Sequence, residues 1–281
     1  MNSFDNHRLP RHKFKTVVII VLGIVIGCAV LVFLYPNILG SPKVDQSDQT
    51  PSIVVSEPQL EPEPEPAPAQ VAPQPPAKVA PDYSIPPIVD GMVPVITNFT
   101  TDQKVVFLGI DDGAVINQSA VDMMQKNHIK ASLYILKGSI ASNSDFINQI
   151  VALGSLVENH SLSHDTNMVK SQTYDQQKNE ICGMADYVQQ QFGRRPVFFR
   201  PPGGAYSNTM RRAAADCGMS AIVTWIAKAN GGSMQYQIGD HLRPGDVVLM
   251  HFRPEFKQDM QAFIDAMVAA GLHTELLEDA L

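Results

Sequence analysis

Two adjacent carboxylates, Asp111 and Asp112, follow a run of apolar and mostly β-branched residues at 105–110. Neighbouring side chains of a strand point to opposite faces, and charges beside a buried run are costly. His160 and His164 stand four residues apart in the segment HSLSH, a spacing that points two imidazoles to one side if the segment makes a helical turn. Asp112 with these two histidines is a ligand set for zinc or another borderline divalent ion, and it leaves one coordination position for water.

The second carboxylate, Asp111, need not bind the ion. It can accept a proton from water whose pKa the ion lowers. Arg200 would keep Asp111 ionised and oriented, and His251 could donate a proton to a leaving group. These types of residue predict metal-assisted hydrolysis of an acyl bond.

Elements of alternating type are expected to position these residues. Apolar runs predict strands at 104–110, 130–136, 155–160, 196–202, 220–226, 246–252 and 273–276. Helical periodicity separates them at 115–128, 145–154, 173–192, 207–218 and 254–271. The alternation predicts an α/β domain with a mainly parallel sheet, and about seven strand–helix units favour a closed barrel. Parallel strands end at a common rim, so the polar residues at the strand ends should converge on one site.

The motifs resemble, in the same order, those of the polysaccharide deacetylases, the NodB-homology fold of carbohydrate esterase family 4. The resemblance covers residues 100–281 and is carried by GIDDGA (109–114), HSLSH (160–164), RPPGG (200–204), Trp225 and LMH (249–251). It implies a distorted (β/α)7 barrel with a strand-end active site, and removal of acetyl groups from N-acetylated sugars. It also implies a divalent metal, with zinc expected and cobalt, manganese or nickel as alternatives.

The resemblance further assigns roles to individual residues by matched position. It implies that Asp111 is the base, with Arg200 beside it, and that His251 is the acid. The implied metal ligands are Asp112, His160 and His164. Trp225 and Leu249 would wall the acetyl pocket, and the Gly203 backbone N–H would hold the oxyanion.

Two positions depart from the family pattern. Gly203 stands where the family has an aromatic residue, and Tyr206, which follows, is the remaining candidate for a substrate contact. Lys228 stands near the place of an aspartate that orients and charges the catalytic histidine in the family. These departures favour the alternative function, a catalytically weak or inactive glycan-binding protein of the cell wall that retains the deacetylase fold.

The residues at 16–35 form an uncharged apolar run of 20 residues, long enough for a helix that spans a hydrocarbon core. The tail at 1–15 is basic, which predicts a single-pass membrane protein with a cytoplasmic N-terminus and an extracellular domain. A cleaved signal peptide has a shorter apolar core. A lipoprotein processing box would end at Cys28, but here the apolar run continues to Leu34.

Residues 36–94 are predicted to be a disordered linker, because 14 of the 21 prolines lie between 36 and 90 among glutamates. The globular domain is predicted at 95–281. The net charge of −7 gives no reason to expect a nucleic-acid partner, so the expected partners are the membrane and an extracellular glycan, with peptidoglycan favoured. Cys182 and Cys217 lie on two predicted helices in an exported domain, and their spacing leaves a disulfide open.

Overall fold

The structure is a computed structural model that describes residues 80–281. Within this range no helix has the length and apolar character needed to cross a membrane. The predicted membrane helix at 16–35 lies outside the described residues, as do the basic tail and the linker up to residue 79. Residues 80–94 were assigned to the linker, but Tyr83 and Val93 are only 7% and 0% exposed. The packed part of the chain therefore begins before the predicted boundary at residue 95.

The strands of residues 80–281 are β1 (Val95–Ile96), β2 (Val105–Asp112), β3 (Ser132–Ile135), β4 (Leu156–Val157), β5 (Phe198–Phe199), β6 (Ala221–Val223), β7 (Ala227–Ala229), β8 (Met234–Tyr236), β9 (Val247–His251) and β10 (His273–Glu275). The helices of the same range are α2 (Gln118–Lys126), α3 (Lys137–Ser142), α4 (Ser144–Ala152), α5 (Met168–Ser171), α6 (Tyr174–Phe192), α7 (Asn208–Asp216) and α8 (Phe256–Ala269), with the 3-10 turns η1 (Pro202–Gly204) and η2 (Leu277–Ala280). The predicted alternation is confirmed, whereas the short elements β1, β7, β8, α3 and α5 were not predicted.

The strands form two sheets. The larger sheet has the order β4-β3-β2-β9-β7-β8 with β10 beside β2, and all its pairs are parallel except β7–β8. The smaller sheet has the parallel order β1-β6-β5. The two sheets meet where Asn159 and Phe199 form an isolated parallel bridge. The described strands thus do not make one continuous ladder, and the closed barrel stays a prediction.

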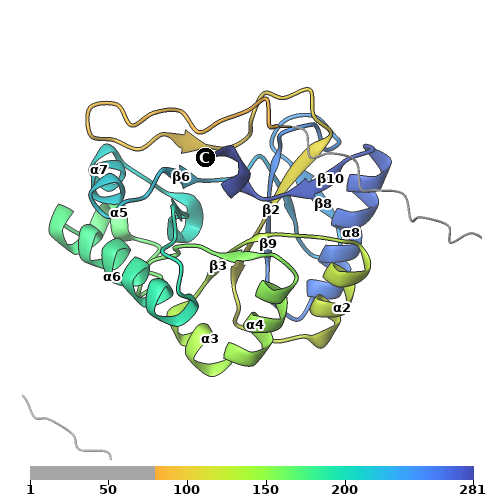
Figure 1. The fold of residues 1–281 in the computed structure, drawn as a ribbon, viewed down its shortest axis with the longest axis horizontal. Helices are drawn as coiled ribbons and strands as arrows, with labels where there is room; N and C mark the ends of the chain where they lie inside the picture. The colour runs from red at the N-terminus through yellow and green to blue at the C-terminus, as the bar shows by residue number, and fades with distance from the viewer. Residues whose placement is uncertain (1–79) are drawn as a thin grey trace, which may run out of the picture. The chain divides into compact units, whose positions relative to one another are not determined.

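The alternation along β2 gives the larger sheet two different faces. Val106, Leu108 and Ile110 belong to the apolar cluster that includes residues of α2, α4 and α8, and these helices cover the outside of the strands (Figure 1). The other face of β2, which carries Phe107, Gly109 and Asp111, is called the inner face below. The sequence run at 105–110 is apolar throughout because both faces of this central strand are buried.

The N-terminal ends of the strands are closed by segments from both ends of the described chain. Val105, the first residue of β2, shares an apolar cluster with Tyr83 and with Leu277 of η2. The Ile85 backbone N–H donates to the carbonyl of Ala280 at 3.0 Å. The inner face is therefore sealed at this end, and the carboxyl ends of the strands form its other end.

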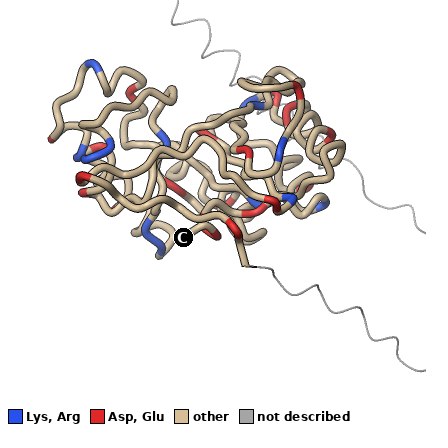
Figure 2. The backbone as a smooth tube through the Cα atoms, turned by 90° about the horizontal axis from the view of Figure 1, so that it is seen from above, with Lys and Arg blue, Asp and Glu red and all other residues tan. Residues whose placement is uncertain are grey.

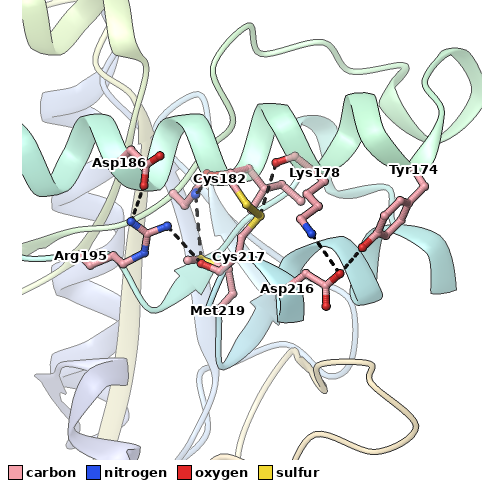
Figure 3. The surroundings of a disulfide bond; sticks show 10 residues. Tyr174, Lys178, Cys182, Asp186, Arg195, Asp216, Cys217 and Met219 are labelled. Atoms are coloured by element: carbon pink, nitrogen blue, oxygen red, sulfur yellow. Dashed lines mark hydrogen bonds and ion pairs between the residues drawn. A yellow bond between two sulfur atoms is a disulfide. The ribbon is translucent and has the colours of Figure 1, made fainter.

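Helices α6 and α7 cover the smaller sheet and are linked covalently. Cys182 of α6 and Cys217, the residue after α7, form a disulfide with their Cα atoms 4.9 Å apart (Figure 3). The bond that the sequence left open is therefore present in the structure. Lys178 of α6 and Asp216 of α7 add an ion pair at 3.3 Å beside it. Acidic and basic residues are interspersed over the described backbone (Figure 2).

Candidate active site

The two carboxylates that end β2 are turned toward the same place. Asp112 has a φ of 73°, in the left-handed region that non-glycine residues rarely adopt, and Gly113 follows at 76°. The alternation of side chains between the two faces of β2 is interrupted at Asp112. As a result, Asp111 Oδ2 and Asp112 Oδ1 each lie 3.7 Å from the same atom, Nε2 of His160. This backbone strain brings both carboxylates to one site.

His160 and His164 meet through a loop and not through the expected helical turn. Ser161 and His164 both have positive φ values, 65° and 56°. The Ser161 hydroxyl accepts a hydrogen bond from the backbone N–H of His164 at 3.1 Å, and the Asn159 side chain accepts one from the N–H of Ser161 at 3.0 Å. The two imidazole rings end 4.9 Å apart between centroids. The spacing predicted the neighbourhood correctly, but its helical explanation is wrong.

Asp112, His160 and His164 place one ligand atom each within 4.8 Å of one another. Nε2 of His164 lies 3.3 Å from Asp112 Oδ1, which is buried and has no hydrogen-bond partner among residues 80–281. Bonds of about 2.0–2.1 Å to a tetrahedral zinc separate their donors by about 3.3–3.4 Å, close to this distance. An unpaired buried oxygen between two imidazoles fits a divalent cation.

The surroundings of His160 prepare it as a ligand. Its Nδ1 forms a hydrogen bond of 2.7 Å with the carbonyl oxygen of Arg200, which fixes Nδ1 as the protonated nitrogen and leaves the lone pair on Nε2. Burial lowers the pKa of His160, against the opposing charge of Asp111. The imidazole is therefore held neutral, in the form that binds metal.

Arg200 orients Asp111 from the interior of the domain. Its side chain is 0% exposed, and Nη1 donates to Asp111 Oδ1 at 2.7 Å. Its guanidinium lies over the ring of Tyr134, with Cζ 4.1 Å from the centroid, and Nε donates to the carbonyl of Val223 at 3.3 Å. This fixed donor occupies one oxygen of Asp111 and leaves Oδ2 on the side of His160.

His251 and Leu249 lie on β9, directly beside β2. The Cα partner of His251 is Asp111 and that of Leu249 is Gly109, so both residues share the inner face with the carboxylate. Leu249 is 4% exposed. The side chain of His251 is half-buried and forms no hydrogen bond with another of the described residues. It is therefore free to interact with a substrate.

Trp225 and the glycines of η1 form a further wall. The Trp225 ring centroid lies 5.9 Å from Cζ of Arg200. Gly204 has a φ of 78°, and a Cβ at this position would lie 2.7 Å from the Trp225 ring, so only glycine fits. Gly203 lies beside Thr166. Tyr206 is 45% exposed, and its contact with a substrate stays a prediction.

Sequence reasoning missed two residues of the site. Tyr134, the Cα partner of Asp111 on β3, supports the guanidinium of Arg200, and burial raises the pKa of its hydroxyl well above the usual value. Gly109 leaves the space in which that guanidinium lies, because a Cβ there would be 2.3 Å from Nη1. The inward position of Tyr134 in KASLYIL was a usable signal, whereas the role of Gly109 depends on a residue 91 positions away.

A buried carboxyl pair lies outside the site. Glu158 accepts hydrogen bonds from Arg194 at 2.6 Å and from the Phe198 N–H at 2.6 Å. Burial and the neighbouring Glu278 raise the pKa of Glu158 well above its usual value. Ser132 of β3 donates to Glu278 at 3.1 Å, which attaches η2 to the larger sheet.

Comparison with known proteins agrees with this geometry. The family model described as polysaccharide deacetylase matches residues 98–222. That segment contains the donor set, the carboxylate Asp111 and Arg200, and it ends before Trp225 and His251. The matched segment of this chain is therefore similar to polysaccharide deacetylase domains.

Three relatives cover about half of the chain. An uncharacterized protein of Streptomyces coelicolor is 35% identical over 157 residues, which are 55% of this chain and 62% of that protein. A bifunctional xylanase/xylan deacetylase of Cellvibrio japonicus is 30% identical over 154 residues, 52% of this chain and 23% of that protein. A peptidoglycan-N-acetylglucosamine deacetylase of Bacillus cereus is 22% identical over 160 residues, 53% of this chain and 73% of that protein. This chain thus spans less than two thirds of the first two relatives.

Solved structures share the fold. A peptidoglycan N-acetylglucosamine deacetylase superposes with a TM-score of 0.57 at 19% identity, over 66% of this chain and 92% of that one. A family 4 pseudoenzyme from Bacillus anthracis superposes with a TM-score of 0.54 at 19% identity, over 66% of this chain and 68% of that one. The described residues have the α/β fold of carbohydrate esterase family 4. Because an enzyme and a pseudoenzyme share that fold, activity must be argued from the site.

Proposed function

We propose that the chain is a metal-dependent hydrolase that removes acetyl groups from an N-acetylated glycan. The observation that supports this proposal is that the two oxygens of Asp111 have different neighbours. Oδ1 is held by the buried Arg200 at 2.7 Å, while Oδ2 lies 3.7 Å from His160 at the edge of the donor set. A carboxylate placed in this way is suited to accept a proton beside a metal centre without binding the metal itself.

Asp112, His160 and His164 would hold the ion, for which their donor types favour zinc over cobalt, manganese or nickel. When bound, a divalent cation supplies Lewis acidity and lowers the pKa of water. Asp111 accepts the proton of the attacking water, with Arg200 fixing its orientation.

The other residues act on the substrate. His251, beside Asp111 in the strand register, donates a proton to the departing nitrogen. The Gly203 backbone N–H holds the developing negative oxygen, and Trp225 and Leu249 wall the acetyl group. Tyr206, which is exposed, would contact a part of a polymeric substrate that lies farther from the acetyl group.

Peptidoglycan is the proposed polymer, and the chain is proposed to act outside the cell from a single membrane anchor. The relative from Bacillus cereus named for peptidoglycan supports the substrate. The uncharged run at 16–35 behind a basic tail supports the anchor, and the disulfide between Cys182 and Cys217 fits an oxidising compartment.

A non-catalytic glycan-binding protein is the second candidate. The observation that favours it is Lys228, a cation on the strand next to β9 where the resembled family has an aspartate for its catalytic histidine. A binding protein would keep the fold, and could keep the metal, without releasing acetate.

Acetate release by the purified full chain, with and without added Zn²⁺ or Co²⁺, tests the proposal on peptidoglycan, chitin oligomers and acetylated xylan. His164→Ala should lose both the metal, measured by elemental analysis, and the acetate release. His241→Ala is the matched control, because His241 is exposed and pairs with its exposed neighbour Asp240. Absence of acetate from the metal-loaded chain on every substrate would leave the binding protein as the better account.

The proposed orientation has its own test. Protease added to intact cells should cut within residues 40–79 and release a fragment that contains residues 80–281. Protection of that fragment until the membrane is opened would refute the external location.

A further inference from the structure

Lys228 lines a cavity beside the site and has no partner there among the described residues. The cavity has a volume of about 270 Å³, and its lining residues are Trp225, Ala227, Lys228, Gln235, Tyr236 and Gln237. The side chain of Lys228 forms no ion pair or hydrogen bond with another residue of 80–281, and it is partly buried. An ammonium that is partly withdrawn from water and lacks a counter-charge favours an anionic ligand.

The register places this cation on the same side of the sheet as the candidate catalytic residues. Lys228 of β7 is the Cα partner of Leu249 on β9, which in turn is the partner of Gly109 on β2. Ala227 and Ala229, its neighbours along β7, belong to the apolar cluster that packs against the helices. Side chains alternate along a strand, so Lys228 faces inward with Leu249, two residues before His251.

The same cavity contains groups that suit a sugar. Trp225 lines it and also lies beside Arg200, so the cavity adjoins the site around Asp111. Gln235 offers an amide that can donate to and accept from hydroxyls, whereas Gln237 Nε2 already donates to the carbonyl of Trp225 at 2.7 Å and leaves its amide oxygen to accept. Apolar ring surface with a few placed polar groups is the usual composition of a small-molecule site.

We propose that this cavity binds the carboxylate of an acidic sugar unit in the glycan, with Lys228 as the residue that selects it. The inference rests on the proposed function and names the substrate class of that site as a glycan that carries carboxylates next to its acetamido groups. The substrate then supplies the negative charge that the aspartate of the resembled family supplies from the protein. A lactyl ether on an amino sugar and a uronic acid both offer such a carboxylate.

Trp225 is the single tryptophan of the chain, so intrinsic fluorescence reports binding at this cavity or at the adjoining acetyl pocket without requiring turnover, and the Lys228 variants below separate the two. The purified full chain is titrated with three oligosaccharides of similar length. One is a neutral N-acetylglucosamine oligomer, one is a peptide-free glycan strand with lactyl carboxylates, and one alternates N-acetylglucosamine with a uronic acid.

We expect at least one acidic probe to bind about tenfold or more tightly than the neutral one, as one charge-assisted hydrogen bond allows. The tighter of the two identifies the source of the carboxylate. Raising the salt concentration from 0.05 M to 0.5 M should shrink the preference, because it screens the partly exposed ammonium.

Lys228→Gln should abolish the preference, while Lys228→Arg should keep most of it. Lys257→Gln, which removes an exposed lysine on α8, changes the net charge equally and should have no effect. Equal binding of neutral and acidic probes by the unaltered chain, or a preference that survives Lys228→Gln in a variant that folds normally by circular dichroism, would overturn the proposal. Selective binding without acetate release would instead refute only the proposed hydrolase activity.

Discussion

Replacing Gly109 with alanine should displace the guanidinium that orients Asp111. The added Cβ would lie 2.3 Å, 2.4 Å and 2.7 Å from Nη1, Nη2 and Cζ of Arg200, whereas ordinary contact begins at 3.4 Å. The guanidinium would have to retreat by about 1 Å, which stretches its 2.7 Å bond to Asp111 beyond hydrogen-bond range. The side chain has no exposed surface toward which to move, and the Tyr134 ring confines it at 4.1 Å.

The expected cost follows from the contacts that are lost. A hydrogen bond to a charged group contributes about 1.5–3 kcal/mol, and the contact of the guanidinium with the Tyr134 ring about 0.5–1 kcal/mol. Gly109→Ala should therefore lower the free energy of unfolding by about 2–4 kcal/mol.

Urea unfolding at pH 7 measures this change, with a chelator present so that metal binding does not contribute to stability. Gly138→Ala is the matched control, because a Cβ at Gly138 in α3 meets no atom within 4 Å. It should leave stability unchanged or raise it by up to about 1 kcal/mol through helix propensity. A loss below about 1 kcal/mol for Gly109→Ala would refute the claim that the guanidinium is confined.

Three further predictions follow from the same structure. Asp111→Asn should lower acetate release about 10²- to 10⁴-fold while metal content stays unchanged, and an unaltered rate would exclude Asp111 as the base. Joint replacement of Cys182 and Cys217 by serine should cost about 3–4 kcal/mol in urea unfolding for a sequence separation of 35, whereas an unchanged midpoint would contradict a formed disulfide. The pKa of Glu158 is raised above 4.5 by burial and by Glu278, so its contribution to stability is present at acid pH and lost as pH rises through the raised value. Glu278→Gln should therefore gain more stability relative to the unaltered chain at pH 8 than at pH 5, and equal gains at both would disprove the coupling.

The donor set could be predicted because the types of its residues carry the chemistry. Asp112, His160 and His164 belong to the few residue types that bind divalent metals, and the apolar runs of the sequence place them at or just after the ends of predicted strands. The conformation that joins them could not be predicted in the same way. Asp112 and Ser161 have positive φ values, which only a few per cent of non-glycine residues adopt, and the residue types alone do not indicate where such values occur.

Longer-range features were missed for a related reason. Glu158 and Glu278 are 120 positions apart, and nothing in either local segment indicates that the two carboxyls meet. The hairpin of β7 and β8 has only three residues in each strand, too short for a period of two to stand out. The extent of the packed domain was underestimated because the prolines near Tyr83 favour a linker by composition, although Tyr83 itself is buried.

The hydrogen bond between Ile85 and Ala280 has a consequence for how the domain can be combined with other proteins. It joins segments near both ends of the described chain at the sealed end of the strands, whereas Asp111 and His251 lie at the carboxyl ends of β2 and β9. Neighbouring termini allow a domain to be inserted into a surface loop of another protein or to be circularly permuted. The domain can therefore be fused or immobilised at either end without covering the carboxyl ends of the strands, where the candidate site lies.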